Sequence, residues 1–238
     1  MISFLKNASN YLKRKKHYSR SLAFYKQFFS SDDLVFDIGA NIGERSQLFL
    51  EIGAKVICVE PQINCLKILH EKFDGNKNVV IVDKALGESE GEGSITICET
   101  DHTISTMSDK WKAEGRFSNT YTGGQNVKVS VSTLDNLIEK YGLPKFCKID
   151  VEGFEVSVIK GLSKKIPFIS FEFTREFLKD AEDILRHLSA IGDVEVNFSL
   201  GESMMLFDKQ WISSHDMFSQ INKMDDQLLW GDVYIKFK

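Results

Sequence analysis

Val35-Phe36-Asp37-Ile38-Gly39-Ala40-Asn41-Ile42-Gly43 decides the fold: an apolar strand reaches an acid and enters a turn with glycines spaced Gly-x-x-x-Gly. A second strand further along the chain ends in Lys148-Ile149-Asp150-Val151-Glu152-Gly153-Phe154-Glu155. Parallel α/β sheets bind their ligands at the carboxyl ends of strands. The two segments therefore predict one site, in which the first cradles a nucleotide-like cofactor and the second supplies chemistry beside it.

Strands and helices alternate from residue 34 onward, which predicts a parallel sheet with right-handed crossovers. The predicted strands are Leu34–Ile38, Lys55–Val59, Asn78–Val82, Lys145–Ile149, Phe168–Phe173, Val194–Phe198, Met204–Phe207 and Val233–Phe237. The predicted helices are Glu44–Ile52, Ile63–Phe73, Ser132–Tyr141, Glu155–Lys160 and Arg175–Ala190. Two of the strands near the end of the chain are not separated by a convincing crossover segment. We therefore expect an antiparallel strand at one edge of the sheet. The segments 93–98 and 127–131 alternate like an antiparallel ribbon, and the polar loop 99–126 between them is expected to be a lid or disordered.

The turn after the first strand favours a cationic ligand over a pyrophosphate. Gly39 and Gly43 let the backbone turn tightly and approach a ligand. Ala40 and Asn41 stand where a dinucleotide-binding Gly-x-Gly-x-x-Gly turn needs its extra glycine. Asp37 places negative charge where a pyrophosphate would lie, and that charge instead suits the ammonium of an amino-acid ligand. We therefore expect this whole turn to contact the cofactor.

Two further acids follow the second and third strands. Glu60 ends the second strand, where an acid can accept hydrogen bonds from both ribose hydroxyls. Asp83 ends the third strand and is expected near the adenine edge. A site with one partner for an ammonium and one for a ribose describes S-adenosylmethionine.

At these residues the chain resembles the FkbM family of S-adenosylmethionine-dependent methyltransferases. The resemblance rests on 36–43, Val59-Glu60-Pro61, Ala85-Leu86-Gly87, Thr133-Leu134-Asp135, 148–155 and Trp230-Gly231-Asp232-Val233-Tyr234. It implies a Rossmann-like, seven-stranded class I methyltransferase sheet with helices on both faces. It also implies O-methylation of a hydroxyl on a sugar, glycan or secondary metabolite, with Ala85 at the cofactor.

Asp150 is the first candidate for a catalytic base or an acceptor-binding group. Glu152 could share that task, and Lys148 could lower the proton affinity of Asp150. The two acids permit a divalent cation without requiring one, so no metal site is predicted. Their alternative role is to cap the short helix that follows. Glu172, an acid in an apolar strand, needs a partner or a role, and His102 is a weaker candidate base in the loop.

The charge is distributed unevenly. Residues 1–31 carry seven Lys or Arg and no acid, so a chain of net charge −4 has +7 there and −11 elsewhere. We predict a basic helical extension over 1–31 and a methyltransferase domain over 32–238. The helix could pack on the domain through Leu12, Leu22, Phe24, Phe28 and Phe29. It could also pair protomers, cover the cofactor or contact an anionic membrane.

The four cysteines form no Cys-x-x-Cys pair, which favours buried free thiols and a reducing, cytoplasmic compartment. The chain shows no signal-peptide pattern or membrane span.

A nucleotide-cofactor-dependent oxidoreductase or epimerase is an alternative function, disfavoured by the missing Gly-x-Gly-x-x-Gly. An RNA methyltransferase that binds through the basic arm is another, disfavoured by the acidic body.

Overall fold

The computed structural model describes residues 2–98, 105–116, 118–121 and 124–238, with the side chains of residues 2–13 and 121 outside this description. The large sheet contains β1 Leu34–Ile38, β2 Lys55–Val59, β3 Val79–Val82, β7 Phe146–Ile149, β8 Phe168–Thr174, β9 Val194–Leu200 and β10 Trp230–Phe237. A small sheet contains β4 Ala85–Leu86, β5 Gly91–Ile97 and β6 Gln125–Ser132. The helices are α1 Ile2–Tyr25, α2 Glu44–Ile52, α3 Ile63–Phe73, α4 Asp109–Glu114, α5 Leu134–Tyr141, α6 Glu155–Lys160, α7 Leu178–Ile191 and α8 Ser214–Asn222, with short 3-10 turns at Ser118–Tyr121 and Arg175–Phe177.

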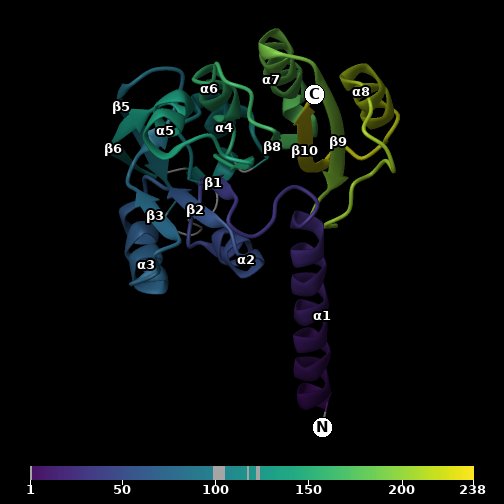
Figure 1. The fold of residues 1–238 in the computed structure, drawn as a ribbon. Helices are drawn as coiled ribbons and strands as arrows, with labels where there is room; N and C mark the ends of the chain where they lie inside the picture. The colour runs from purple at the N-terminus through teal and green to yellow at the C-terminus, as the bar shows by residue number, and fades with distance from the viewer. Residues whose placement is uncertain (1, 99–104, 117, 122–123) are drawn as a thin grey trace.

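The large sheet has the strand order β3-β2-β1-β7-β8-β10-β9 (Figure 1). Neighbouring strands from β3 to β8 are parallel, and β10 pairs antiparallel with both β8 and β9. The order reverses between β1 and β7, which is where ligands of open α/β sheets bind. The predicted Rossmann-like sheet with an antiparallel edge is confirmed, and β10 itself lies one position inside that edge.

Helices cover both faces of the sheet because alternate strand residues point to opposite sides. On one face, Val35 packs in a cluster with residues of α1, α2 and α3. On the other face, Phe36 and Ile38 pack with residues of α5, α6, α7 and α8. Both clusters are buried, so β1 and β7 lie in the middle of a two-sided core.

The end of α1 and the segment after it belong to this core. Phe24, Tyr25, Phe28 and Phe29 are all buried, and the Phe28 ring stacks on Phe146 of β7 at 5.4 Å between centroids. The predicted packing of Phe24, Phe28 and Phe29 is therefore confirmed. The beginning of α1 stands away from the body (Figure 1). None of the helices in the described part of the chain is long and apolar enough to cross a membrane.

One predicted strand is wrong, and two helices, α4 and α8, were missed. Residues 204–207 lie in the connection between β9 and α8, and Met204 has a left-handed φ of 50° that ends any extended run. Phe207 still donates its N–H to the Phe198 carbonyl and stacks on that ring at 4.5 Å, so its apolar character serves packing. Helix α8 begins after Ser213, whose hydroxyl accepts the Asp216 N–H as an N-cap.

Candidate active site

The two segments that decide the fold meet at the switch point. The register of parallel strands β1 and β7 sets Asp37 beside Lys148. The Asp150 N–H donates to the Ile38 carbonyl at 3.0 Å, so both turns leave the sheet together. Gly39 has φ +78°, and a Cβ there would lie 1.8 Å from the Asp150 carbonyl oxygen. Glycine is therefore required at this crossing.

The turn after β1 is held from the end of β2. The N–H groups of Gly39 and Ala40 both donate to the Val59 carbonyl, at 2.9 and 3.0 Å. Asn41 has a left-handed φ of 51°, and its N–H donates to Oε2 of Glu60 at 2.9 Å. Gly43 faces α3, because a Cβ there would lie 2.6 Å from the Phe73 ring. Gly39 and Asn41 thus border the site, whereas Gly43 serves the packing of α3.

Glu60 is a buried carboxyl group with two backbone donors and free acceptor capacity. Besides Asn41, the Gln62 N–H donates to its Oε1 at 2.8 Å. Burial raises the pKa of Glu60 to about 7, against the lowering effect of these hydrogen bonds. The Gln62 side chain donates to this carboxylate as well. A carboxylate has about four acceptor sites, so acceptor capacity remains for a ribose hydroxyl.

Two cavities meet around the turn. A narrow one is bordered by Glu60, Ala85 and the apolar side chains of Ile95, Met107 and Phe154. A larger one is a cleft of about 1050 Å³ that reaches Asp37, Lys148 and the start of α2. Both are bordered by Gly39, Asn41, Asp150 and Glu152. Asp83 is exposed and borders neither cavity, whereas the predicted Ala85 borders the narrow one.

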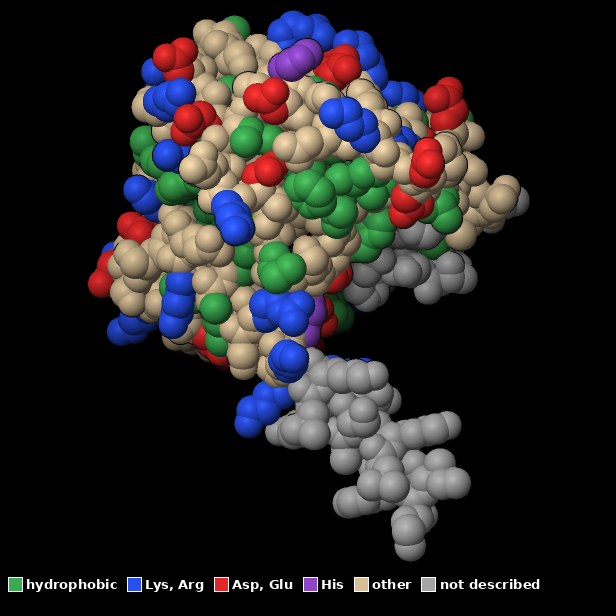
Figure 2. All heavy atoms as spheres, turned by 90° about the vertical axis from the view of Figure 1, so that its right-hand side faces the viewer, with side chains coloured by type: hydrophobic (Ala, Val, Ile, Leu, Met, Phe, Trp, Pro, Cys, Tyr) green, Lys and Arg blue, Asp and Glu red, His purple; other side chains and the backbone are tan. Residues whose placement is uncertain are grey.

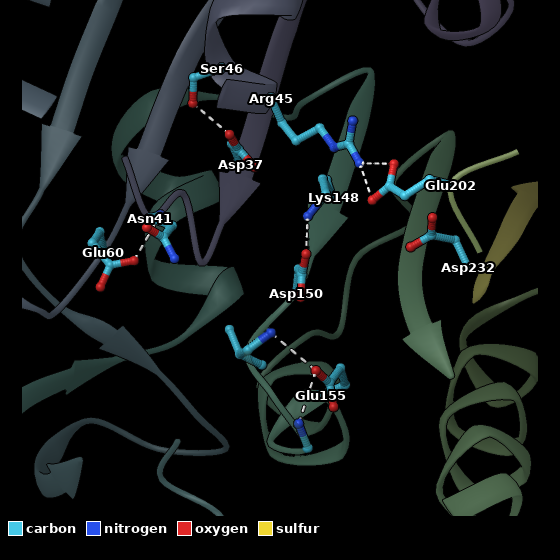
Figure 3. A network of polar contacts seen from close by, with 12 residues as sticks. Asp37, Asn41, Arg45, Ser46, Glu60, Lys148, Asp150, Glu155, Glu202 and Asp232 are labelled. Atoms are coloured by element: carbon cyan, nitrogen blue, oxygen red, sulfur yellow. Dashed lines mark hydrogen bonds and ion pairs between the residues drawn. The ribbon is translucent and has the colours of Figure 1, made fainter. Parts of the chain in front are cut away.

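Lys148 is a buried cation between two acids. Its Nζ donates to Oδ2 of Asp150 at 2.7 Å (Figure 3). Burial alone would lower the pKa of Lys148, but Asp150 and Asp37 raise it above its ordinary value. Burial would likewise raise the pKa of Asp150, and the lysine holds that pKa below its ordinary value. Lys148 therefore keeps Asp150 ionised, the direction expected from the sequence.

Asp37 retains one carboxylate oxygen without a partner among the described residues. Its Oδ2 accepts a hydrogen bond from the Ser46 hydroxyl at 2.5 Å, while the buried Oδ1 has none. Burial raises the pKa of Asp37, and Lys148 opposes that rise. Such an orphaned acceptor at a cleft wall fits a ligand that brings a hydrogen-bond donor or a positive charge.

A row of acids crosses neighbouring strands beside the cleft, and Asp150, Glu152 and Glu172 of this row line it. Glu172 pairs with Asp232 across β8 and β10, and Asp150 follows Ile149, the β7 neighbour of Phe171. Carboxylate oxygens of Asp150, Glu152 and Glu172 lie within 4.8 Å of one another. Burial, followed by the neighbouring acids, raises the pKa of Glu172 well above its ordinary value. Three carboxyls this close could hold a proton or a divalent cation between them.

The turn that carries Glu152 is clamped from two sides. Glu152 and Gly153 both have left-handed φ angles, 54° and 83°. Oε1 of buried Glu155 accepts the N–H groups of Val151 at 3.0 Å and Gly153 at 3.3 Å. From the other side, the Thr106 hydroxyl donates to the Glu152 carbonyl at 2.6 Å. Glu155 is thus more than the first-turn helix residue that the sequence predicts.

Sequence reasoning missed the far wall of the cleft. Arg45 at the start of α2 contacts Glu202 at 2.6 and 2.7 Å (Figure 3). The Glu202 carbonyl lies 3.2 Å from Nε2 of His17 in α1. Burial raises the pKa of Asp232, in the last strand, to about 6. A charged residue inside the apolar strand 230–237 was the available signal for Asp232. No comparable signal pairs Arg45 with a residue so distant in sequence.

The loop predicted as a lid is partly described. His102 lies outside the described residues. Trp111 of α4 is buried against Phe177 and borders the large cleft, with its indole N–H unpartnered among the described residues. Gly153 packs beneath this ring, since a Cβ there would lie 2.8 Å from it. The part of the loop that carries α4 therefore covers the turn of the candidate acids.

A Rossmann-like sheet with a cleft at the β1–β7 switch point and a buried, unpaired acid oxygen in its wall is consistent with a class I methyltransferase. The family model of the methyltransferase FkbM domain matches residues 37–197. The chain belongs to the FkbM methyltransferase family, it is an enzyme, and its cofactor is S-adenosylmethionine. This confirms the resemblance on which the sequence interpretation rests.

Similar proteins include a hexuronic acid methyltransferase, AglP, from Haloferax volcanii, which is 28% identical over 142 residues. That alignment covers 59% of this chain and 54% of AglP, so the chain spans about half the length of this relative. Precorrin-6y C5,15-methyltransferase from Geobacter metallireducens superposes with a TM-score of 0.49 at 10% identity, covering 93% of this chain and 86% of that one. A TehB-like SAM-dependent methyltransferase from Corynebacterium glutamicum gives 0.44 at 9% identity, covering 98% and 99%.

Proposed function

We propose that the protein transfers a methyl group from S-adenosylmethionine to a hydroxyl oxygen of a sugar or glycan. The observation that carries this proposal is the convergence of Asp150, Glu152 and Glu172 at the wall of an open cleft of about 1050 Å³. Carboxylates are the groups that bind and deprotonate hydroxyls. The name of the relative AglP, a hexuronic acid methyltransferase, supports a sugar acceptor. A secondary-metabolite hydroxyl would use the same chemistry.

The residues around the β1 turn fit the cofactor. The orphaned Oδ1 of Asp37 would accept a hydrogen bond from the amino-acid ammonium, directly or through water. The carboxylate of Glu60, already oriented by two backbone N–H groups, would accept the ribose hydroxyls. Ala85 and its apolar neighbours in the narrow cavity would border the base. Since Gly43 faces α3, its proposed part is to shape the turn.

The acceptor side would orient and deprotonate the hydroxyl. When bound, S-adenosylmethionine supplies an electrophilic methyl group on a positively charged sulfur. Asp150, kept ionised by Lys148, would accept the proton of the acceptor hydroxyl, a role that contributes roughly 10²–10⁴-fold to rate. Glu172, whose raised pKa favours its protonated form, would donate a hydrogen bond to a neighbouring sugar oxygen. Glu152 would hold a second hydroxyl.

Methyl transfer from radiolabelled S-adenosylmethionine tests this proposal. The acceptor panel contains hexuronic acids, neutral hexoses, lipid-linked glycans and RNA, each assayed with Mg²⁺ and with EDTA. Asp150→Asn should lose activity on the preferred sugar while calorimetry shows unchanged affinity for S-adenosylhomocysteine. Glu92→Gln, at an exposed position of β5, is the matched control. Labelling of RNA alone, or full activity of Asp150→Asn, would refute the proposal.

Membership of a methyltransferase family decides against the oxidoreductase or epimerase alternative. We also propose a cytoplasmic location, supported by four cysteines that are buried and form no disulfide with one another. Fractionation of cells with an antibody to the chain would test the location.

A further inference from the structure

Helix α1 is fixed to the body at one end only. Its 24 residues make it about 36 Å long at 1.5 Å per residue. Phe24 and Tyr25 are buried in the core, and the Arg20 guanidinium donates to the Ser203 carbonyl at 3.3 Å. From that end the helix leaves the body, and its N-terminus lies far from the sheet (Figure 1). Contacts with the body therefore explain why the last turns of α1 are present, but among the described residues the earlier turns of the helix have no such contacts to explain them.

The helix carries cations that the body does not neutralise. Arg14, Lys15 and Lys16 are exposed, and within the described part of the chain none of them forms an ion pair or a side-chain hydrogen bond. Figure 2 shows Lys and Arg side chains gathered where α1 leaves the body. All seven cations of residues 1–31 occur without a single acid. So concentrated and exposed a charge favours binding to an anionic partner outside this chain.

We propose that α1 is the docking element of this protein for an anionic lipid bilayer. A planar surface can be reached by a helix that projects from the body, while most of residues 32–238, which carry a net charge of −11, stays clear of it and only the edge of the cleft next to α1 comes near. A nucleic acid large enough to engage the helix would also meet that acidic body, which would repel it. Apart from its packed last turns, the sequence of the helix combines Lys and Arg with Phe4, Leu5, Tyr11 and Leu12, a composition found in interfacial membrane helices.

Docking through α1 would set the cleft beside the lipid surface. His17, Tyr18 and Ser21 border the large cleft, and they follow the basic run 13–16 within two helical turns. An acceptor held at the membrane would then reach the cleft without leaving that surface. The docking itself requires only the exposed charge of the helix, so it does not depend on the acceptor proposed above.

Co-sedimentation of the full chain with lipid vesicles tests the docking. We expect binding to phosphatidylcholine vesicles that contain phosphatidylglycerol, weakening as NaCl rises, and little binding to phosphatidylcholine alone. The triple variant Arg14→Gln, Lys15→Gln, Lys16→Gln should bind roughly a hundredfold more weakly, at about fivefold for each cation removed.

The matched control is Lys67→Gln, Lys164→Gln, Lys209→Gln, which removes three exposed cations from the body. It should bind anionic vesicles like the wild type, and both triple variants should keep their affinity for S-adenosylhomocysteine. Equal losses of vesicle binding in the two triple variants would overturn the proposal. Wild-type binding that is equally strong with and without phosphatidylglycerol would overturn it too. Salt-sensitive retention on single-stranded RNA with no vesicle binding would assign the helix to nucleic acid instead.

Discussion

Replacing Glu155 by glutamine separates the geometric role of this side chain from its charge. Both backbone N–H groups that it binds donate to the same oxygen, Oε1. The carbonyl oxygen of a glutamine can occupy that position and accept both. Glu155→Gln should therefore keep the 150–155 turn intact, whereas Glu155→Ala leaves two buried N–H groups unsatisfied, at about 1–3 kcal/mol each.

The magnitude follows from the pKa of the carboxyl group. Burial, reinforced by Asp150, raises the pKa of Glu155 from 4.5 to about 7. As the pH rises from about 4.5 to about 7, the unfolded chain releases this proton and the folded protein retains it. The free energy of unfolding of the wild type therefore falls across that pH window and stays lower at higher pH. Glu155→Gln cannot ionise, so its stability relative to the wild type should rise by about 3 kcal/mol between these pH values.

Urea unfolding of wild type, Glu155→Gln and Glu155→Ala at closely spaced pH values between 4.5 and 8 measures this difference. The comparison cancels other groups with raised pKa values, such as Glu60 and Asp232. Affinity for S-adenosylhomocysteine should survive in the glutamine variant and fall in the alanine variant. Parallel pH profiles for wild type and Glu155→Gln would refute the reasoning, because Glu155 would then be ionised at no cost.

Three further predictions concern the switch point. Lys148→Met should destabilise the protein by about 3–5 kcal/mol in urea unfolding, because it leaves the buried carboxylate of Asp37 without its cation and removes the ion pair of the partly exposed Asp150; unchanged stability would contradict this. Its residual methyl transfer should shift to higher pH, since the pKa of Asp150 rises without the lysine. Glu60→Ala should weaken S-adenosylhomocysteine binding at least tenfold by calorimetry, as loss of one charge-assisted hydrogen bond of about 1.5–3 kcal/mol implies; full affinity would remove Glu60 from the ribose role. Gly39→Ala should lower Tm sharply through its clash with the Asp150 carbonyl, while Gly91→Ala, with no atom within 4 Å of the added carbon, should not.

The sequence could predict the sheet and the meeting of β1 with β7, because their signals are local. Strands β1, β2 and β7 are each a mostly apolar run followed directly by an acid or glycine, and hydrophobic burial places such runs side by side in the sheet centre. The same logic failed at Met204–Phe207. There, apolar residues pack onto β9 from a connection that a left-handed residue bends out of register.

The far wall of the cleft, formed by Arg45, Glu202 and the end of α1, could not be predicted because its contacts depend on the finished tertiary structure. Arg45 and Glu202 lie 157 positions apart, and neither stands in a motif. The placement of α1 at the cleft also follows from aromatic packing at its end, whose partners come from distant parts of the chain. Composition indicated that the helix was basic, but only the structure shows which part of it remains free.

The spacing of the second motif has a physical cause in the strand geometry. Residues two apart in a strand share a face, so Lys148 and Asp150 point to the same side of β7. The register of β1 places Asp37 beside that lysine on the neighbouring strand. One buried ammonium thus faces the buried carboxylate of Asp37 and the partly exposed carboxylate of Asp150. Burying a carboxylate without a cation costs several kcal/mol, a large part of the stability of a small domain. The lysine therefore stabilises the fold around these acids, before either acid acts on a ligand.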